Sequence, residues 1–224
     1  MFPYKDENPT RTIPFVTISL IIINIIVFLM HLSNSSEFKR IIFTYGATPA
    51  YLLSLDSARP VHPFITLFTS MFMHGGLLHI VSNMLYLWIF GNNIEDRIGH
   101  IKFIFFYILG GIVAAYAHSI SDPSSVIPMI GASGAVSGVL GAYLLIFPYA
   151  KVHTLIFLGF FVQVISLPAF IVIGFWVVIQ LINGMLSKEV VDNVGVAWFA
   201  HIGGFLFGII SIKIFLLKRG SRGR

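Results

Sequence analysis

The chain has 224 residues, of which 57% are hydrophobic and only 10% are charged. Ordinary soluble domains carry about 25% charged residues, and a soluble fold of this length could not bury so much apolar surface in one core. The composition therefore excludes a soluble globular enzyme, a disordered chain and a nucleic-acid-binding protein, and it predicts an α-helical membrane protein. The formal net charge of +5 then reflects Lys and Arg residues retained on the cytoplasmic side.

Six apolar segments are long enough to cross a membrane, because about 20 helical residues span the hydrocarbon core. They lie near residues 13–32, 74–91, 101–118, 126–147, 155–185 and 196–217. Pro168 is expected to kink the long fifth span, since proline lacks the N–H that a helix interior needs. We predict an all-α fold in which the whole chain, residues 1–224, forms one six-helix membrane domain.

The connection between the first and second spans, residues 33–73, is too apolar for a free loop. It contains the aromatic residues Tyr45, Tyr51, Phe64, Phe68 and Phe72. Because aromatic rings are favoured at the boundary between lipid and water, we expect this segment to lie at the outer membrane interface.

The distribution of Lys and Arg predicts the orientation of the chain. An even number of spans places both termini on one side of the membrane. With that side in the cytoplasm, most of the 14 basic residues lie inside, and only Lys39, Arg40, Arg59 and Lys188 lie outside. We therefore expect a multi-pass protein with both termini cytoplasmic, and the lack of soluble domains suggests a prokaryotic cell membrane.

Polar residues within the predicted spans are costly in hydrocarbon and mark candidate functional sites. His79 and Asn83 share one face of the second span, because they are separated by one helical turn. Ser133 and Ser137 lie in the fourth span, and His201 lies in the sixth. All three spans enter the membrane from outside, and Ser133 and His201 are each about 12 Å along their helices. We expect these groups to meet in the outer half of the membrane.

Small residues indicate that the fourth and sixth spans touch, since glycines one turn apart let helix backbones approach closely. These glycines are Gly134 and Gly138 in the fourth span and Gly204 and Gly208 in the sixth. The approach would bring the Ser133 hydroxyl within hydrogen-bonding reach of His201, which is a pairing of nucleophile and base. None of the nine Asp and Glu residues lies at this depth, so the pattern predicts a Ser–His dyad.

His79 and Asn83 are hydrogen-bond donors and suit an oxyanion hole, together with peptide N–H groups near Ser133 at a helix start. His74 and Ser137 are interpreted as structural or substrate-proximal. Three imidazoles could in principle hold a metal ion. However, the chain has no H-E-x-x-H pattern and no nearby carboxylate, so we expect neither a metal nor a cofactor.

These residues resemble the motifs of the rhomboid family of intramembrane serine proteases. The matching segments are Gly131-Ala132-Ser133-Gly134, Ala200-His201-Ile202-Gly203-Gly204, the set His74, His79 and Asn83, and the acidic–basic triplet Glu95-Asp96-Arg97. They follow the expected order across all six spans. Each motif alone has little specificity, but together they are highly specific.

The resemblance implies that Ser133 is the nucleophile, that His201 is the base, and that His79 and Asn83 contribute to the oxyanion hole. It implies single-span transmembrane substrates that are cut near their outer end at small residues. The fifth span and residues 187–195 would gate and cap the site, and Gly131 would be structural or substrate-proximal.

Two positions depart from the family pattern. Ser137 stands where many rhomboids have an aromatic ring that stacks on the catalytic histidine. Ile65-Thr66 stands where a Trp-Arg pair is often found. Either another apolar ring would then substitute for it, or the histidine would be held more loosely. We also expect Glu95 and Arg97 to form a structural pair at the inner membrane edge.

Two other functions are compatible with parts of the pattern. A non-catalytic rhomboid-like protein would bind transmembrane helices, but such relatives usually lack the serine or the histidine, and this chain keeps both. A transporter or channel would need a polar path through the bundle or interrupted helices. Here the polar groups cluster at one depth, which favours a protease whose partners are transmembrane substrates and membrane lipid, not nucleic acid.

Overall fold

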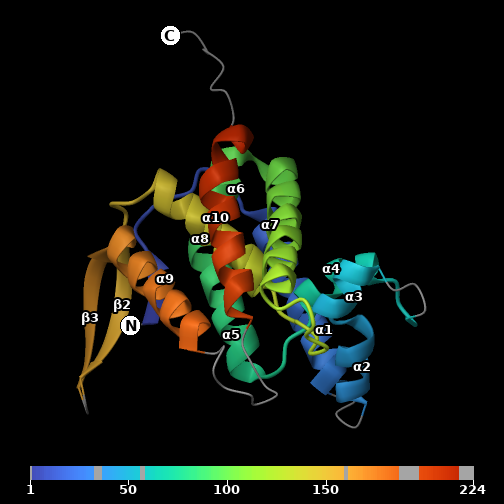
Figure 1. Cartoon of the computed structure of the whole chain (residues 1–224). Coiled ribbons are helices and arrows are strands. Elements are labelled where there is room, and N and C mark those ends of the chain that lie inside the picture. The colour runs from blue at the N-terminus through green and yellow to red at the C-terminus, as the bar shows by residue number, and fades with distance from the viewer. Residues whose placement is uncertain (1, 33–36, 56–58, 159–160, 187–196, 217–224) are drawn as a thin grey trace.

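A computed structural model describes residues 2–32, 37–55, 59–158, 161–186 and 197–216. It is mostly helical, with one small sheet (Figure 1). The elements are β1 (Phe2–Asp6), α1 (Phe15–Leu32), α2 (Phe38–Tyr45), α3 (Pro49–Ser54), α4 (Pro63–Thr69), the 3-10 turn η1 (Ser70–Phe72), α5 (Leu77–Tyr86), the π-helical turn η2 (Leu87–Gly91), α6 (Asn92–Ile98), α7 (His100–Ser121), α8 (Ser133–Ile146), β2 (Lys151–Leu158), β3 (Phe161–Pro168), α9 (Ala169–Leu186) and α10 (Trp198–Phe215).

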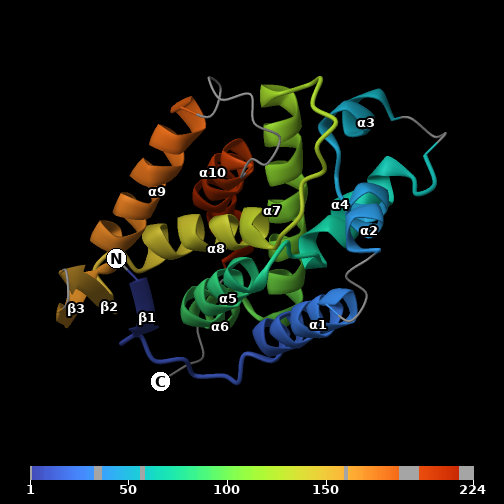
Figure 2. The same ribbon diagram turned by 90° about the horizontal axis from the view of Figure 1, so that it is seen from below.

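Helix α8 crosses the middle of the molecule and is enclosed by α5, α7, α9 and α10 (Figure 2). Its most extensive contacts are with α10 and then α7. A Cβ atom on Gly204 would collide with the carbonyl oxygen of Gly134, and one on Gly208 would collide with that of Gly138. The predicted close approach of these two glycine-bearing helices is therefore confirmed.

Four described helices, α1, α7, α9 and α10, are long and apolar enough to cross a membrane. The run from α5 through η2 to α6 meets the α4–η1 helix at an angle of 85°, and this bent pair could form one further span. Helix α8 is apolar but has only 14 residues. The bundle thus has four or five candidate spans by length and composition.

The predicted fifth span near residues 155–185 is wrong in its first part, and the predicted all-α fold is mostly helical but includes one small sheet. Strands β2 and β3 form an antiparallel hairpin, in which Lys151 pairs with Pro168 and Leu158 with Phe161, and β1 adds to β2. This segment is rich in Val, Ile, Phe and Thr, which favour strands. Because Pro168 has no N–H to donate, α9 begins only after it, at Ala169.

The fourth helix also begins later than predicted. Residues 126–132 are not helical, and Met129 instead forms an isolated antiparallel bridge with Ala47. Pro128 lies in this segment, and Gly131 has a φ of +123°, which a helix does not accommodate. The helix therefore begins at Ser133.

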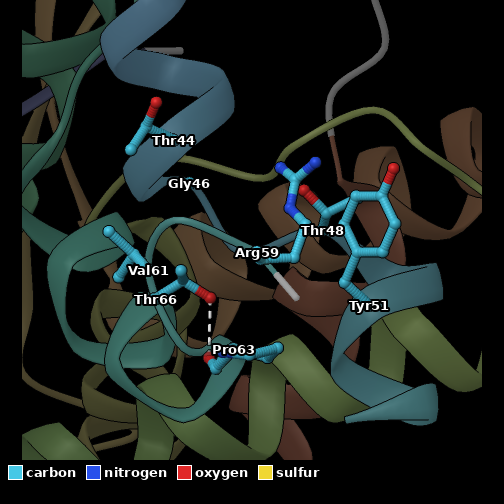
Figure 3. A pocket seen from close by; sticks show the side chains of 8 residues that line it. All are labelled: Thr44, Gly46, Thr48, Tyr51, Arg59, Val61, Pro63 and Thr66. Atoms are coloured by element: carbon cyan, nitrogen blue, oxygen red, sulfur yellow. Dashed lines mark hydrogen bonds between the residues drawn. The ribbon is translucent and has the colours of Figure 1, made fainter. Parts of the chain in front are cut away.

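The connection between α1 and α5 forms the short helices α2, α3 and α4, which project from one side of the bundle (Figure 1). A pocket lies among them (Figure 3). The Arg59 guanidinium is 4.0 Å from the centre of the Tyr51 ring, and Arg59 Nη2 donates to the Phe43 carbonyl at 2.8 Å. Thr66 Oγ1 donates to the Pro63 carbonyl at 2.7 Å. These contacts order the segment internally.

The predicted pair of Glu95 and Arg97 is wrong, because Glu95 instead binds the start of α1. Its fully buried carboxylate accepts from Val16 N at 2.9 Å and from Thr17 N and Oγ1 at 2.7 Å. It also contacts His100 Nδ1 at 2.5 Å, while Arg97 is exposed. A carboxylate is favoured here because free N–H groups and positive dipole charge lie at a helix N-terminus.

Candidate active site

Ser133 is the first residue of α8, and the turn before it requires a glycine. Gly131 has a φ of +123°, which L side chains rarely adopt. A Cβ atom on Gly131 would come within 2.7 Å of His79 Nε2 and within 3.5 Å of Ser133 Oγ. Gly131 N also donates to the Ser70 carbonyl at 2.9 Å. The missing side chain thus leaves room for His79 and Ser133 to face the same space.

The structure brings Ser133 and His201 together. His201 lies in the first turn of α10, and its Nε2 atom is 2.8 Å from Ser133 Oγ. The imidazole is buried, with only 8% of the residue exposed. This distance allows the imidazole to accept the proton of the hydroxyl, as a nucleophile and its general base require.

The second nitrogen of His201 has a partner that the sequence analysis missed. His201 Nδ1 lies 2.6 Å from Oε1 of Gln180, a buried residue of α9. The available signal was the position of Gln180, since an amide within an otherwise apolar helix is costly unless it is hydrogen-bonded. No motif connects it with His201, so the pairing itself required the fold.

Two tryptophan rings surround His201 in place of the aromatic residue that position 137 lacks. The Trp176 ring is tilted by 36° to the imidazole, with centroids 5.9 Å apart, and the Trp198 ring lies edge-on at 6.1 Å. Ser137 Oγ donates to the Ser133 carbonyl at 2.6 Å. Trp176 from α9 therefore supplies the ring contact, and Ser137 bonds to its own helix.

His79 and Asn83 lie on one face of α5 beside the serine. Asn83 is buried, and its Nδ2 donates to the His79 carbonyl at 2.8 Å. His79 Nδ1 accepts from Gly75 N at 3.3 Å, which leaves Nε2 toward Gly131. The peptide N–H groups that open α8 at Ser133 have no acceptor within their own helix.

His74 is fully buried behind His79. The two rings meet edge to face, with centroids 5.0 Å apart. His74 Nε2 lies 3.5 Å from the backbone nitrogen of Ala132. Its position beside the turn before Ser133 fits the predicted structural role, which stays a prediction.

A small cavity lies beside the Ser133 hydroxyl. Much of its lining consists of glycine and alanine, including Gly111, Ala114, Gly131, Gly134, Ala197 and Ala200. Met71 closes part of it, since its sulfur occupies the space that a Cβ on Gly111 would need. The small side chains of this lining leave space next to Ser133.

The described part of the chain places no acidic residue in this arrangement. Within the described residues, His201 has no carboxylate partner, and no group of three His, Asp or Glu side chains is placed to hold a metal ion. Residues 187–195, predicted to cap the site, lie outside the residues that the structure describes.

Comparison with known proteins identifies relatives of the whole bundle. A family model described as a Rhomboid domain matches residues 62–218. RHOMBOID-like protein 1 of Arabidopsis thaliana is 29% identical over 74% of the chain, and Rhomboid protease GluP of Bacillus subtilis is 27% identical over 99%. The chain spans only 38% of the length of each of these two relatives.

The match with a mitochondrial relative covers a larger share of that relative's length. RHOMBOID-like protein 6, mitochondrial, of Arabidopsis thaliana is 26% identical over 97% of the chain and 74% of the relative. Because one of these relatives is named mitochondrial and another comes from a bacterium, the prokaryotic origin stays a prediction. Because the family model matches more than half of its residues, the chain belongs to the rhomboid family and is an integral membrane protein.

Proposed function

We propose that the protein is an intramembrane serine endopeptidase that cuts single-span transmembrane substrates through a dyad of Ser133 and His201. The observation that carries this proposal is the 2.8 Å separation of Ser133 Oγ and His201 Nε2 within a buried site. The small cavity beside Ser133 favours a small substrate residue next to the cleaved bond.

In the proposed reaction, His201 Nε2 accepts the hydroxyl proton as Ser133 Oγ attacks the peptide carbonyl. His79 Nε2, an Asn83 amide N–H and the N–H groups at the start of α8 would stabilise the oxyanion. The imidazolium then gives its proton to the leaving amine, and the C–N bond breaks. A water molecule, deprotonated by the same imidazole, attacks the acyl ester and releases Ser133.

We propose six spans, in which α8 and the α5–α6 run join α1, α7, α9 and α10. The 14 residues of α8 extend only about 21 Å, against a hydrocarbon core of about 30 Å. If its far end lies at one membrane boundary, Ser133 lies beneath the opposite surface. Helices α2–α4 would then lie at the outer interface, beside the site.

Contacts at the far end of the bundle support placing the chain's two ends on one side. Asp96 of α6 accepts from Arg11 N at 3.0 Å and from Thr12 N at 2.8 Å, just before α1. Lys102 Nζ donates to the Phe215 carbonyl at 3.1 Å, at the end of α10. The predicted excess of basic residues assigns this side to the cytoplasm.

The proposal is tested by fluorophosphonate labelling and by cleavage of a generic single-span substrate in proteoliposomes. Wild type should be labelled and active. Ser133→Ala should not be labelled, and its cleavage rate should be more than about 10³-fold lower than that of wild type. Ser137→Ala is the matched control on the same helix and should keep both. Undiminished cleavage by Ser133→Ala would refute the proposal, and substrate binding without cleavage by wild type would indicate a non-catalytic helix-binding protein.

A further inference from the structure

The imidazole of His201 is held at both of its nitrogen atoms. Nε2 faces Ser133 Oγ, and Nδ1 faces Oε1 of Gln180 at 2.6 Å. An amide oxygen only accepts hydrogen bonds, so this contact requires the hydrogen on Nδ1. The lone pair is then on Nε2, where it can accept the Ser133 proton.

We propose that Gln180 is a positioning residue that holds His201 in the tautomer and orientation needed to deprotonate Ser133. The proposal rests on the proposed protease function. In a catalytic triad a carboxylate accepts this Nδ1–H bond and keeps the imidazole oriented. Here a neutral amide occupies that place, and within the described residues His201 has no carboxylate partner.

The position of Gln180 on α9 supports this role. Trp176 lies one turn earlier on the same helix, and its ring faces the imidazole at 5.9 Å. One helix thus contacts His201 twice: the Trp176 ring limits its tilt and the Gln180 amide limits its rotation. Both Gln180 and His201 are buried, so water does not readily replace the amide oxygen.

Substitutions that keep or remove the acceptor oxygen separate positioning from packing. Gln180→Met keeps a long unbranched side chain but lacks the amide oxygen, whereas Gln180→Glu keeps an oxygen at the same reach. We expect Gln180→Met to lower kcat about 10- to 100-fold with little change in KM, because a misplaced base loses reactivity while substrate contacts remain. Gln180→Glu should retain most of the activity. Val178→Ala, on an exposed position of α9, is the control and should match wild type.

A small fluorophosphonate gives a second readout, because its reaction with Ser133 needs the base but not a bound transmembrane helix. Its labelling rate should fall in Gln180→Met by the same factor as kcat and recover in Gln180→Glu. Thermal unfolding in detergent identifies folded variants, and Gln180→Leu provides a second acceptor-free variant if Gln180→Met does not fold.

The two proposals fail in distinguishable ways. Absence of Ser133 labelling in wild type would overturn the protease function itself. Normal labelling in wild type with an equal rate in a folded, acceptor-free Gln180 variant would overturn only the positioning role. If Gln180→Glu and Gln180→Met lower the labelling rate equally, the positioning role is also overturned, because the acceptor oxygen would then make no difference.

Discussion

At the scale of single residues, Asn83 has a donor available for a reacting carbonyl. Its Nδ2 atom gives one hydrogen bond to the His79 carbonyl at 2.8 Å, and an amide nitrogen carries two N–H groups. We expect Asn83→Ala to lower kcat by about 10²-fold without abolishing cleavage, because the other oxyanion donors remain.

The control for Asn83 is its neighbour Ser82, whose hydroxyl bonds back to the carbonyls of Leu78 and His79. Ser82→Ala should therefore cleave at close to the wild-type rate. Steady-state kinetics on the single-span substrate measure both variants. An Asn83→Ala enzyme with unchanged kcat would exclude Asn83 from the oxyanion hole.

Asp6, outside the membrane-spanning helices, is predicted to make stability depend on pH. Its Oδ2 atom accepts from Tyr143 Oη at 2.7 Å and from Asn93 Nδ2 at 2.8 Å. Burial raises the pKa of the Asp6 carboxyl above its ordinary value, although these hydrogen bonds lower it. The folded state therefore binds the proton more tightly than the unfolded state, and stability falls as pH rises from the ordinary aspartate pKa through the raised one.

Replacing Asp6 with Asn should remove this contribution, because the amide oxygen still accepts both hydrogen bonds but carries no charge. Tm is measured for both proteins in detergent across the weakly acidic range. As pH rises, the Tm of wild type should fall relative to the Tm of Asp6→Asn. A difference that is constant with pH would contradict the assignment.

The sequence could predict Ser133 and His201 because each lies in a short motif with glycines that bring the helices together. It could not predict Gln180 as their partner. The contact joins two helices whose relative rotation depends on packing along their whole length, and local sequence does not determine that rotation. Trp176 was missed for the same reason, since the missing ring at position 137 was compatible either with a substitute ring or with a more loosely held histidine.

At the scale of secondary-structure elements, the contact between α8 and α10 determines whether Ser133 and His201 come within hydrogen-bonding distance. A Cβ on Gly208 would collide with the Gly138 carbonyl, which is backbone and cannot rotate away. We expect Gly208→Ala to destabilise the fold by about 1–3 kcal/mol and to reduce cleavage, because separating the helices lengthens the distance between Ser133 and His201.

Gly174→Ala is the matched control for this prediction, because Gly174 lies within α9 and nothing would contact its added Cβ within 4 Å. It should leave activity unchanged and preserve the unfolding temperature. Thermal unfolding and cleavage assays test both variants. A Gly208→Ala protein as stable and active as Gly174→Ala would show that the two helices tolerate separation.

The β2–β3 hairpin shows why hydropathy alone misassigned one element. Residues 155–168 are as apolar as a membrane span and lead directly into α9. Hydropathy averaged along the chain therefore joins these residues to α9 as a single long span. Their β-branched and aromatic residues and Pro168 indicate strands. The pairing with β1 from the N-terminus is a long-range contact that composition does not reveal.

At the scale of the whole molecule, composition predicted a helical membrane protein, and the family comparison and the candidate spans agree. The bend of 85° before α5 and the late start of α8 were not predictable from apolar length, because both depend on how neighbouring segments occupy the space. The interfacial position of residues 33–73 stays a prediction, since it concerns the membrane and not the fold.

The end of the bundle remote from Ser133 is filled with aromatic rings. Its fully buried aromatic residues include Phe90, Phe103, Phe106, Tyr107 and Tyr143. Tyr143 lies edge-on to Phe90 at 4.9 Å, and Phe106 packs on Phe215 at 5.4 Å. On the proposed protease function, water that enters beside Ser133 would meet this aromatic packing, so a peptide bond would be broken inside the bilayer while the proton and ion gradients across it are preserved.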